Sequence, residues 1–317
     1  MKTIVRIFLL CGLLGAISCG SRQTSSPRPV TRDFPMAEVP RMMTDPGESL
    51  SWLCRHFWDR FTATDSLYVC DSVTVNGVPL QEVERQMGVF ATLTEQVPLP
   101  EGQKAMEAFY ERLEAFQLTY PQSNLLPETV ALASHYFYDP NSPVRSEDLY
   151  LPLARRLAAS SLIDGQFRER YAWEAGMCAL NPVGAPATDF VFVDSAGRRR
   201  TLYGVKAART LLIFGHPDCK ACRELMEAME EAPGIREQIA LGGLKVVDVY
   251  IDEDIAQWKA HLAEYPAQWI NGYDPAFAIR GEHLYHVRAI PSLYLLDSKK
   301  TVLLKDATPE RVLQALL

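Results

Sequence analysis

The chain has 317 residues, a formal net charge of −7 and a hydrophobic share of 48%. Its length is enough for two domains of ordinary size. The acidic balance and the lack of a basic stripe argue against nucleic acid as a partner.

The N-terminus has the layout of a secretory signal. Basic residues precede a short apolar run at 7–14, and small residues then lead into Cys19. The sequence Ala16-Ile17-Ser18-Cys19 resembles a bacterial lipobox, which implies removal of residues 1–18 and acylation of Cys19. Several acyl chains would anchor the mature protein stably in a membrane. An ordinary signal peptide cut elsewhere, with Cys19 incidental, is the alternative.

Residues 19–45 are predicted to be a flexible tether. The stretch 23–45 is rich in Ser, Pro, Thr and Arg, and such a composition cannot bury a core. No later segment has the length and apolar character of a transmembrane helix.

Residues 46–180 are predicted to form an all-α domain of five or six helices. Apolar residues from Leu50 to Phe61 follow steps of three and four, which is one face of a helix. Asp45 followed by Pro46 is a typical helix start. Similar patterns cover 80–93 and 106–116, and further helices are expected from Ser146-Glu147-Asp148 and over 167–179.

The cysteine count is informative for an exported protein, because disulfides form and persist outside the cytoplasm. Leaving aside Cys11 and Cys19, five cysteines remain, namely Cys54, Cys70, Cys178, Cys219 and Cys222. An odd number means that at least one is unpaired or that some pair reversibly. The three in the helical half lie among apolar positions and are expected to be buried. A Cys54–Cys70 disulfide is the alternative.

Residues 181–317 change to a pattern of short strands and helices. Strands are predicted at 189–193 and shortly after a turn at Ala196-Gly197, then in the apolar run that ends at Gly215, at 245–252, and as a hairpin of PSLYLLD and TVLLKD. Helices are predicted at 222–232, 255–263 and 309–317. Strands that alternate with helices and end in a hairpin indicate a central mixed sheet with helices on both faces.

Cys219 and Cys222 form a Cys-x-x-Cys pair at a strand-to-helix junction. A zinc site needs four ligands, but no cysteine follows Cys222, and His283 and His286 precede the strand that leads to Pro291. We therefore predict no metal, and no cofactor other than a reversible Cys219–Cys222 disulfide.

The junction suits thiol chemistry. Cys219 would lie at a helix N-terminus, where backbone N–H groups and the helix dipole stabilise a thiolate. Cys219 would attack a substrate disulfide, and Cys222, one turn on, would resolve the mixed disulfide. Lys220 adds positive charge and Asp218 opposes it, so these residues and Glu224 are candidate modulators.

Pro291 is predicted to start a strand, because proline cannot donate to a strand ladder. If the Ile290–Pro291 bond is cis, the backbone of Ile290 can face the cysteine pair and bind an extended substrate chain. A trans proline that merely begins the strand is the alternative.

These motifs together resemble the thioredoxin-like superfamily, in its exported TlpA-like branch. The resemblance covers about residues 183–317 and lies in Val183-Gly184-Ala185-Pro186-Ala187-Thr188-Asp189-Phe190, in 194–202, in the strand into Cys219-Lys220-Ala221-Cys222, and in Ile290-Pro291-Ser292 with Leu295-Leu296-Asp297. It implies a C-terminal α/β thioredoxin-like fold and thiol–disulfide oxidoreductase activity. The predicted class is thus α+β with two domains.

The helical half resembles a domain of unknown function that precedes such modules in lipoproteins of Gram-negative bacteria. The similarity lies in residues 136–143 and 147–150. It implies architecture and location rather than an activity.

The chain departs from the thioredoxin pattern at the proton acceptor. Thioredoxin has a buried Asp six positions before the first cysteine, and that position is Ile213 here. TlpA-like proteins often have a Glu three positions after the second cysteine, where this chain has Leu225. Glu224 and Asp252 are the remaining candidates to accept a proton from Cys222.

The leading hypothesis is a membrane-anchored envelope thiol–disulfide oxidoreductase that reduces or isomerises protein disulfides. Its partners would be protein or peptide disulfides and an upstream membrane or envelope thiol reductant. The alternative is a binding or adaptor lipoprotein whose thioredoxin-like domain is a scaffold without turnover. We expect attachment to the envelope of a Gram-negative bacterium on the periplasmic side, because Ser21-Arg22-Gln23 lacks the acidic residues common in surface-export signals.

Overall fold

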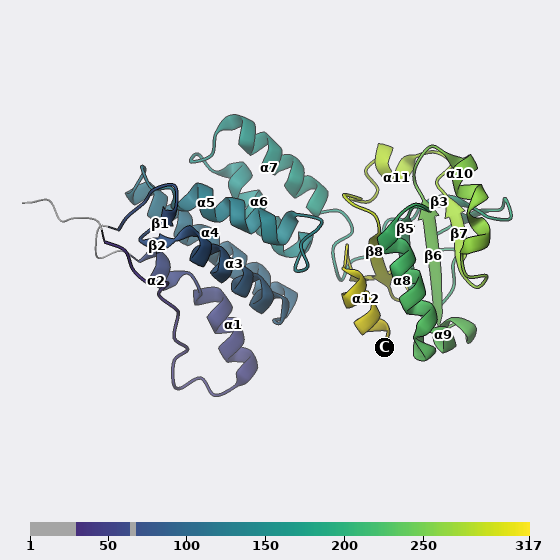
Figure 1. The fold of residues 1–317 in the computed structure, drawn as a ribbon, viewed down its shortest axis with the longest axis horizontal. Helices are drawn as coiled ribbons and strands as arrows, with labels where there is room; N and C mark the ends of the chain where they lie inside the picture. Colours follow the sequence, from purple (N-terminus) through teal and green to yellow (C-terminus); the bar gives the residue numbers. More distant parts are fainter. Residues whose placement is uncertain (1–29, 64–67) are drawn as a thin grey trace, which may run out of the picture.

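The computed structural model describes residues 30–63 and 68–317. The predicted signal peptide and Cys19 lie outside the described residues. The flexible tether predicted over 19–45 is wrong for its later part, because Phe34 is buried in the helical core against Phe57, Trp58 and Phe61. The chain forms a helical part followed by a part built on a mixed sheet, and the two lie side by side along the long axis (Figure 1). Among the described residues, no helix combines the length and the apolar composition that a membrane span requires.

The helical part contains seven α-helices among the described residues. They are α1 (Pro46–His56), α2 (Asp59–Thr62), α3 (Leu80–Glu95), α4 (Leu99–Thr119), α5 (Leu125–Ala133), α6 (Glu147–Ala159) and α7 (Gly165–Cys178). A π-helical turn, η1 (Ser134–Tyr138), extends α5, and a short hairpin joins β1 (Thr74–Val75) to β2 (Val78–Pro79).

The first helix starts where the sequence predicts, since the Asp45 carboxylate accepts a hydrogen bond of 2.8 Å from the Glu48 N–H before Pro46. The apolar stripe from Leu50 to Phe61 is not a single helix, however, because α1 ends at His56 and α2 begins at Asp59. The aromatic residues of both pieces still enter one core, as Trp58 lies in edge contact with Phe90.

The cysteines of the helical part are all free thiols. Cys54 and Cys178 are buried as predicted, whereas Cys70 is exposed and its Sγ lies 3.6 Å from the Ser123 hydroxyl. The alternative of a Cys54–Cys70 disulfide is therefore not formed, since Cys54 lies inside the core on α1 and Cys70 at the surface.

The sheet of the second part has seven strands in the order β4-β3-β7-β6-β5-β8-β9. The strands are β3 (Val191–Asp194), β4 (Arg199–Thr201), β5 (Arg209–Gly215), β6 (Leu244–Tyr250), β7 (Ile270–Tyr273), β8 (Ser292–Leu296) and β9 (Val302–Leu304). Strands β5, β6 and β7 run parallel, and β8 pairs with β5 in the opposite direction.

Helices cover both faces of this sheet, as predicted. Side chains of α8 (Lys220–Glu231), α9 (Pro233–Ala240) and α12 (Pro309–Leu316) pack on one face, with Leu225, Ile235 and Val312 in a shared core. The opposite face packs against Ile279 of α11 (Ala278–Gly281) and against Tyr285. The remaining helical segments are α10 (Ile255–Ala260) and the 3-10 turn η2 (Leu262–Glu264).

Candidate functional site

Strand register brings the two predicted site segments together. Cys219 follows the carboxyl end of β5, and the antiparallel strand β8 begins at Ser292, which pairs with Phe214. Because Pro291 directly precedes Ser292, it lies next to the end of β5. Segments far apart in the chain thus meet at one end of the central strands.

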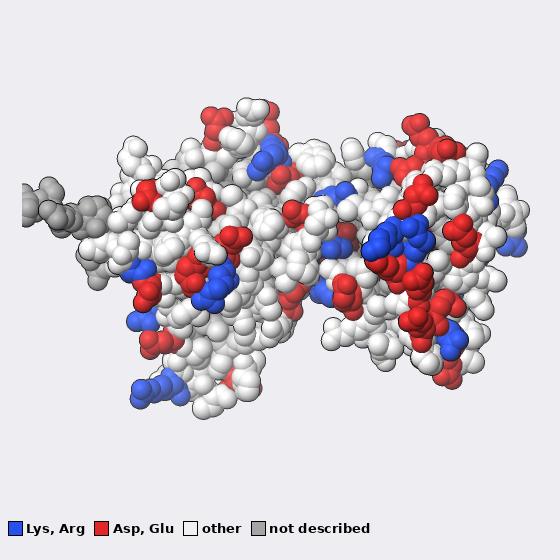
Figure 2. Space-filling model, viewed as in Figure 1, with Lys and Arg blue, Asp and Glu red and all other residues white. Residues whose placement is uncertain are grey.

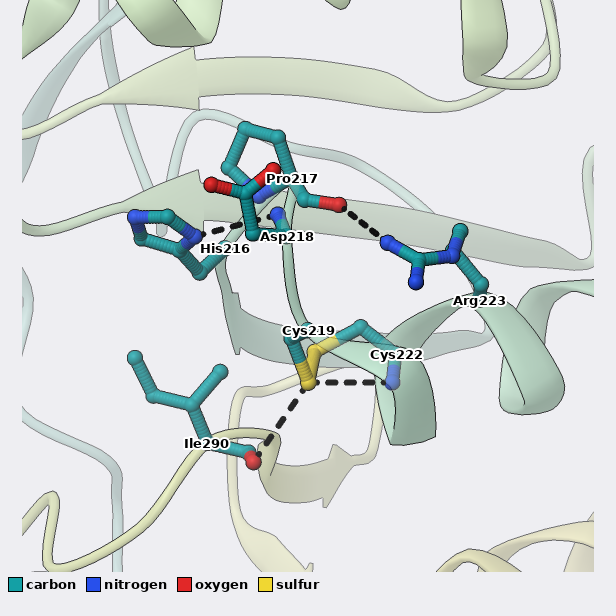
Figure 3. The surroundings of a disulfide bond; sticks show 7 residues. All are labelled: His216, Pro217, Asp218, Cys219, Cys222, Arg223 and Ile290. Carbon is teal, nitrogen blue, oxygen red and sulfur yellow. Dashed lines mark hydrogen bonds between the residues drawn. A yellow bond between two sulfur atoms is a disulfide. The ribbon is translucent and has the colours of Figure 1, made fainter.

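The cysteine pair occupies the N-terminus of α8, as predicted. Cys219 is the N-cap residue, and its Sγ accepts a hydrogen bond of 3.1 Å from the Cys222 backbone N–H (Figure 3). The two cysteines form a disulfide with Cα atoms 5.2 Å apart. Both residues are half-buried, so the sulfur atoms lie close to the surface while the helix end points at Cys219.

The segment before β8 faces this pair. The Ile290–Pro291 peptide bond is cis, which confirms that expectation. The carbonyl oxygen of Ile290 points toward Cys219 and lies 3.5 Å from its Sγ (Figure 3). The backbone of Ile290 is therefore placed where an extended chain attached to Cys219 would pass.

The candidate modulators Asp218, Lys220 and Glu224 lie near the two cysteines, but each contacts a group other than the sulfur atoms. Lys220 is exposed and forms an ion pair of 2.9 Å with Glu224, so neither charge is directed at the sulfurs. The Asp218 carboxylate accepts a hydrogen bond of 2.5 Å from the Gln257 amide. Arg223 donates to the Pro217 carbonyl at 2.8 Å (Figure 3).

The exposed side of α8 carries charges of both signs (Figure 2). Lys220 and Arg223 lie in its first turn, and Glu224, Glu227 and Glu231 follow. Glu224 is therefore part of a solvated surface rather than a group set aside for Cys222.

A buried carboxyl that the sequence analysis did not identify lies behind the pair. Asp248 in the middle of β6 is 4% exposed, and burial raises its pKa to about 7. Asp248 and Cys222 line the same cavity of about 20 Å³, together with His216, Pro217, Arg223, Met226, Glu264, Tyr265 and Trp269. This volume accommodates about one water molecule.

The neighbouring strand makes room for Asp248. Gly215 ends β5, and a Cβ atom at that position would lie 2.8 Å from one carboxylate oxygen of Asp248. Asp248 pairs in register with Ile213, the position at which thioredoxin would have its acid. The carboxyl is thus supplied by β6 instead of β5. The signal was present in the run KVVDVYID, whose central polar residue interrupts a buried strand.

The other predicted acceptor, Asp252, follows β6 and forms an ion pair with Arg280. It is not among the residues that line the cavity beside Cys222. Glu264 also lines this cavity, but it is exposed and lies 4.0 Å from His261. Asp248 is therefore the buried carboxyl beside Cys222.

Comparisons with known proteins agree with this architecture. Residues 18–179 match the family described as a domain of unknown function, DUF5106. A thioredoxin-like protein from Bacteroides caccae is 32% identical, and the match covers 89% of this chain and 97% of that protein at a TM-score of 0.76.

Two further solved structures match shorter stretches. The C-terminal domain of an uncharacterized protein from Bacteroides fragilis is 43% identical, covering 43% of this chain and 97% of its own at a TM-score of 0.42. The thioredoxin domain of a thiol-disulfide oxidoreductase from Bacteroides vulgatus is 17% identical, covering 43% of this chain and 99% of its own at a TM-score of 0.37. No curated protein matches the chain.

Proposed function

This chain belongs to the thioredoxin-like proteins and carries an N-terminal domain of the DUF5106 family, and we propose that it is a thiol–disulfide oxidoreductase. One observation carries the proposal. Cys219 caps α8, with Cys222 one turn on and the Ile290 carbonyl 3.5 Å from its sulfur. A nucleophile, a resolving thiol and a backbone edge for the substrate therefore occupy one place.

In the reduced protein the Cys219 thiolate attacks one sulfur of a substrate disulfide. The substrate S–S bond breaks, its leaving sulfur takes a proton, and a mixed disulfide with Cys219 forms. The Cys222 thiolate then attacks the Cys219 sulfur, which releases the second substrate thiol and forms the Cys219–Cys222 disulfide. The N–H of Cys222, 3.1 Å from the Cys219 sulfur, would stabilise the Cys219 thiolate for the first of these attacks.

Asp248 accepts the proton that Cys222 must lose. The two groups share a cavity of about 20 Å³, so one water can carry the proton between them. A carboxyl with a pKa near 7 is well matched to proton transfer at neutral pH.

The protein acts in the cell envelope. Acylation at Cys19, at the end of the predicted signal peptide, would hold the domains at a membrane through the residues that link Cys19 to the packed segment around Phe34. Its substrates are protein or peptide disulfides. A membrane or envelope thiol reductant would return the Cys219–Cys222 disulfide to the dithiol, because each turnover consumes two electrons.

Turnover of a polypeptide disulfide tests the proposal. The wild-type protein with a thiol reductant should reduce the substrate, and Cys219→Ser should abolish the reaction. Cys222→Ser should accumulate the mixed disulfide on Cys219, detected by mass spectrometry. Equal rates for wild type and Cys219→Ser, without a trapped adduct, would instead favour the adaptor alternative.

A further inference from the structure

The segment that leads to Pro291 is anchored by a residue of the helical part. Glu147, the first residue of α6, is fully buried at the boundary between the two parts. One of its carboxylate oxygens lies 2.5 Å from His286 Nδ1 and 3.1 Å from Arg288 Nε. The other lies 3.1 Å from Lys305 Nζ. Two of these three partners stand within the few residues before Ile290.

A second carboxylate ties the same segment from within the sheet part. Arg288 donates to Asp306 Oδ2 at 2.6 Å, and the Ser292 hydroxyl donates to Asp306 Oδ1 at 3.2 Å. Arg288 precedes Ile290-Pro291 and Ser292 follows it. The backbone at Ile290 is therefore fixed on both sides, and Glu147 holds one of the two anchors.

Aromatic rings of the helical part close over the cluster. Tyr138 of η1 lies under Arg288, with the guanidinium carbon 4.6 Å from the ring centroid. Trp173 of α7 contacts His286 edge to face at 5.7 Å. Side chains of the helical part, which contains neither Cys219 nor Cys222, therefore enclose Arg288 and His286.

Glu147, Cys178 and His286 also place three metal-ligating atoms within 4.8 Å of one another. The positive charge that a cation would supply is already present, since Arg288 and Lys305 both contact Glu147. The contacts therefore describe a buried ion cluster. Removing Glu147 would leave His286 and Lys305 buried without the carboxylate they contact, whereas Arg288 would keep Asp306.

We propose that Glu147 is a positioning residue for the substrate-binding segment at Ile290-Pro291. By holding Arg288 and His286, it keeps the Ile290 backbone at the distance from Cys219 that a bound polypeptide requires. The helical part is then a structural component of the redox site. This role rests on the oxidoreductase function proposed above.

Two full-length variants separate this role from ordinary domain contact. Glu147→Gln removes one of the two carboxylates that hold Arg288 and the one that contacts His286. Glu95→Gln removes a different ion pair between the two parts, in which Glu95 lies 2.9 Å from Arg311 on α12, and it does not contact the Pro291 segment. Each is assayed with a polypeptide disulfide and with a small aromatic disulfide that has no peptide backbone.

We expect Glu147→Gln to lower kcat for the polypeptide disulfide by about tenfold to a hundredfold, because misplacement near 1 Å has effects of that size. Reduction of the small disulfide should stay within about twofold of wild type, since it needs only the thiols. Glu95→Gln should behave as wild type in both assays. Protection of the buried Cys54 thiol from alkylation reports that each variant is folded.

Tyr138→Leu provides a second route if Glu147→Gln does not fold, because it loosens Arg288 without leaving a charge unpaired. It should show the same selective loss.

Unchanged polypeptide turnover, an equal loss with both disulfides, or an equal loss in Glu95→Gln would overturn the positioning role alone. Stoichiometric zinc in the purified protein that Glu147→Gln abolishes would also overturn it. A wild-type protein that reduces neither disulfide would instead overturn the proposed function, and this role with it.

Discussion

Asp248 shows how burial prepares a single side chain for proton transfer. It stands in the central strand β6, where burial raises its pKa to about 7. The carboxyl can therefore hold or release a proton near neutral pH. In the proposed reaction, Cys222, which lines the same small cavity, loses a proton during resolution.

Replacement of Asp248 by Asn should slow resolution of the mixed disulfide by about a hundredfold, the usual effect of removing a general base. In the wild type the resolution rate should rise as the pH passes through about 7, where Asp248 loses its proton. The variant should lack this rise. Rapid-quench measurement of mixed-disulfide decay as a function of pH checks both expectations. Asp252→Asn, which alters the surface pair with Arg280, should keep the wild-type profile.

The same raised pKa has a consequence for stability. A carboxyl whose pKa is higher in the folded than in the unfolded state destabilises the fold as the pH rises between those two values. For Asp248 the interval runs from the ordinary 3.8 to about 7, which corresponds to a cost of at most about 4 kcal/mol above pH 7. Asp248→Asn should therefore increase the free energy of unfolding near pH 8 and change it little near pH 4. Urea denaturation at both pH values checks this, and a variant that is less stable near pH 8 would contradict it.

At the scale of elements, the site depends on the fit between β5 and β6. The end of β5 passes so close to Asp248 that a Cβ atom at Gly215 would lie 2.8 Å from the carboxylate. Glycine is thus required at this point by the neighbouring acid rather than by its own backbone conformation.

Gly215→Ala should destabilise the protein by about 1–3 kcal/mol, the range for overpacking in a filled core. The cost should shrink in an Asp248→Ala background, because the colliding carboxylate is gone. Gly176→Ala serves as the control, since a Cβ there meets nothing within 4 Å and alanine favours the helix. Thermal denaturation of the wild type, the two single variants and the double variant gives the coupling energy between positions 215 and 248. An unchanged cost in the double variant would show that the strain lies elsewhere.

Several elements were predictable because one face of each is apolar, as in α3, α4 and α8. Helix α5 was missed because LLPETVALA is apolar at most positions and so lacks a helical stripe. Strand β7 was missed for the opposite reason. Its sequence INGY carries little apolar signal, and Gly272 is needed there because a Cβ would lie 2.6 Å from the Phe192 ring.

At the scale of the whole molecule, the side-chain contacts between the two parts were not predictable from the chain. The Cys219–Cys222 pair and Pro291 carry local signals, since each residue type suits one strand end or helix end. From its local sequence, Glu147 is only an acidic residue in the first turn of a predicted helix. Arg288 is only a charged residue shortly before a predicted strand. Only the packing of the two parts brings them to 3.1 Å.

The buried ion cluster should make the free energy of unfolding depend on pH, and this dependence should report the ionisation of Glu147. Burial opposes its ionisation, but the contact with His286 and the charges of Lys305 and Arg288 outweigh burial and hold its pKa below the ordinary 4.5. A carboxyl with a lowered folded-state pKa contributes stability that is fully present above its unfolded-state pKa. That contribution is lost as the pH falls through the folded-state value.

Wild type should therefore exceed Glu147→Gln in the free energy of unfolding by about 3–5 kcal/mol near neutral pH, the usual cost of breaking a buried pair. The difference should persist down to about pH 5 and shrink below it, as Glu147 becomes protonated and resembles the amide. Burial raises the pKa values of Asp306 and Asp148, and the negative charge of Glu147 raises both further. Glu147→Gln therefore also lowers these two pKa values relative to wild type, and their titration contributes to the measured difference. Urea denaturation from about pH 7 to about pH 3 gives the difference.

Glu95→Gln supplies a control of opposite sign. Burial raises the pKa of Glu95 despite the nearby Arg311, so its ionised form is disfavoured in the folded state. The stability of wild type relative to Glu95→Gln should therefore increase, not decrease, as the pH falls through this carboxyl's titration. Parallel slopes for the two variants would mean that Glu147 is not ionised within the cluster. Opposite slopes would identify Glu147 as the charge that joins the helical part to the Pro291 segment.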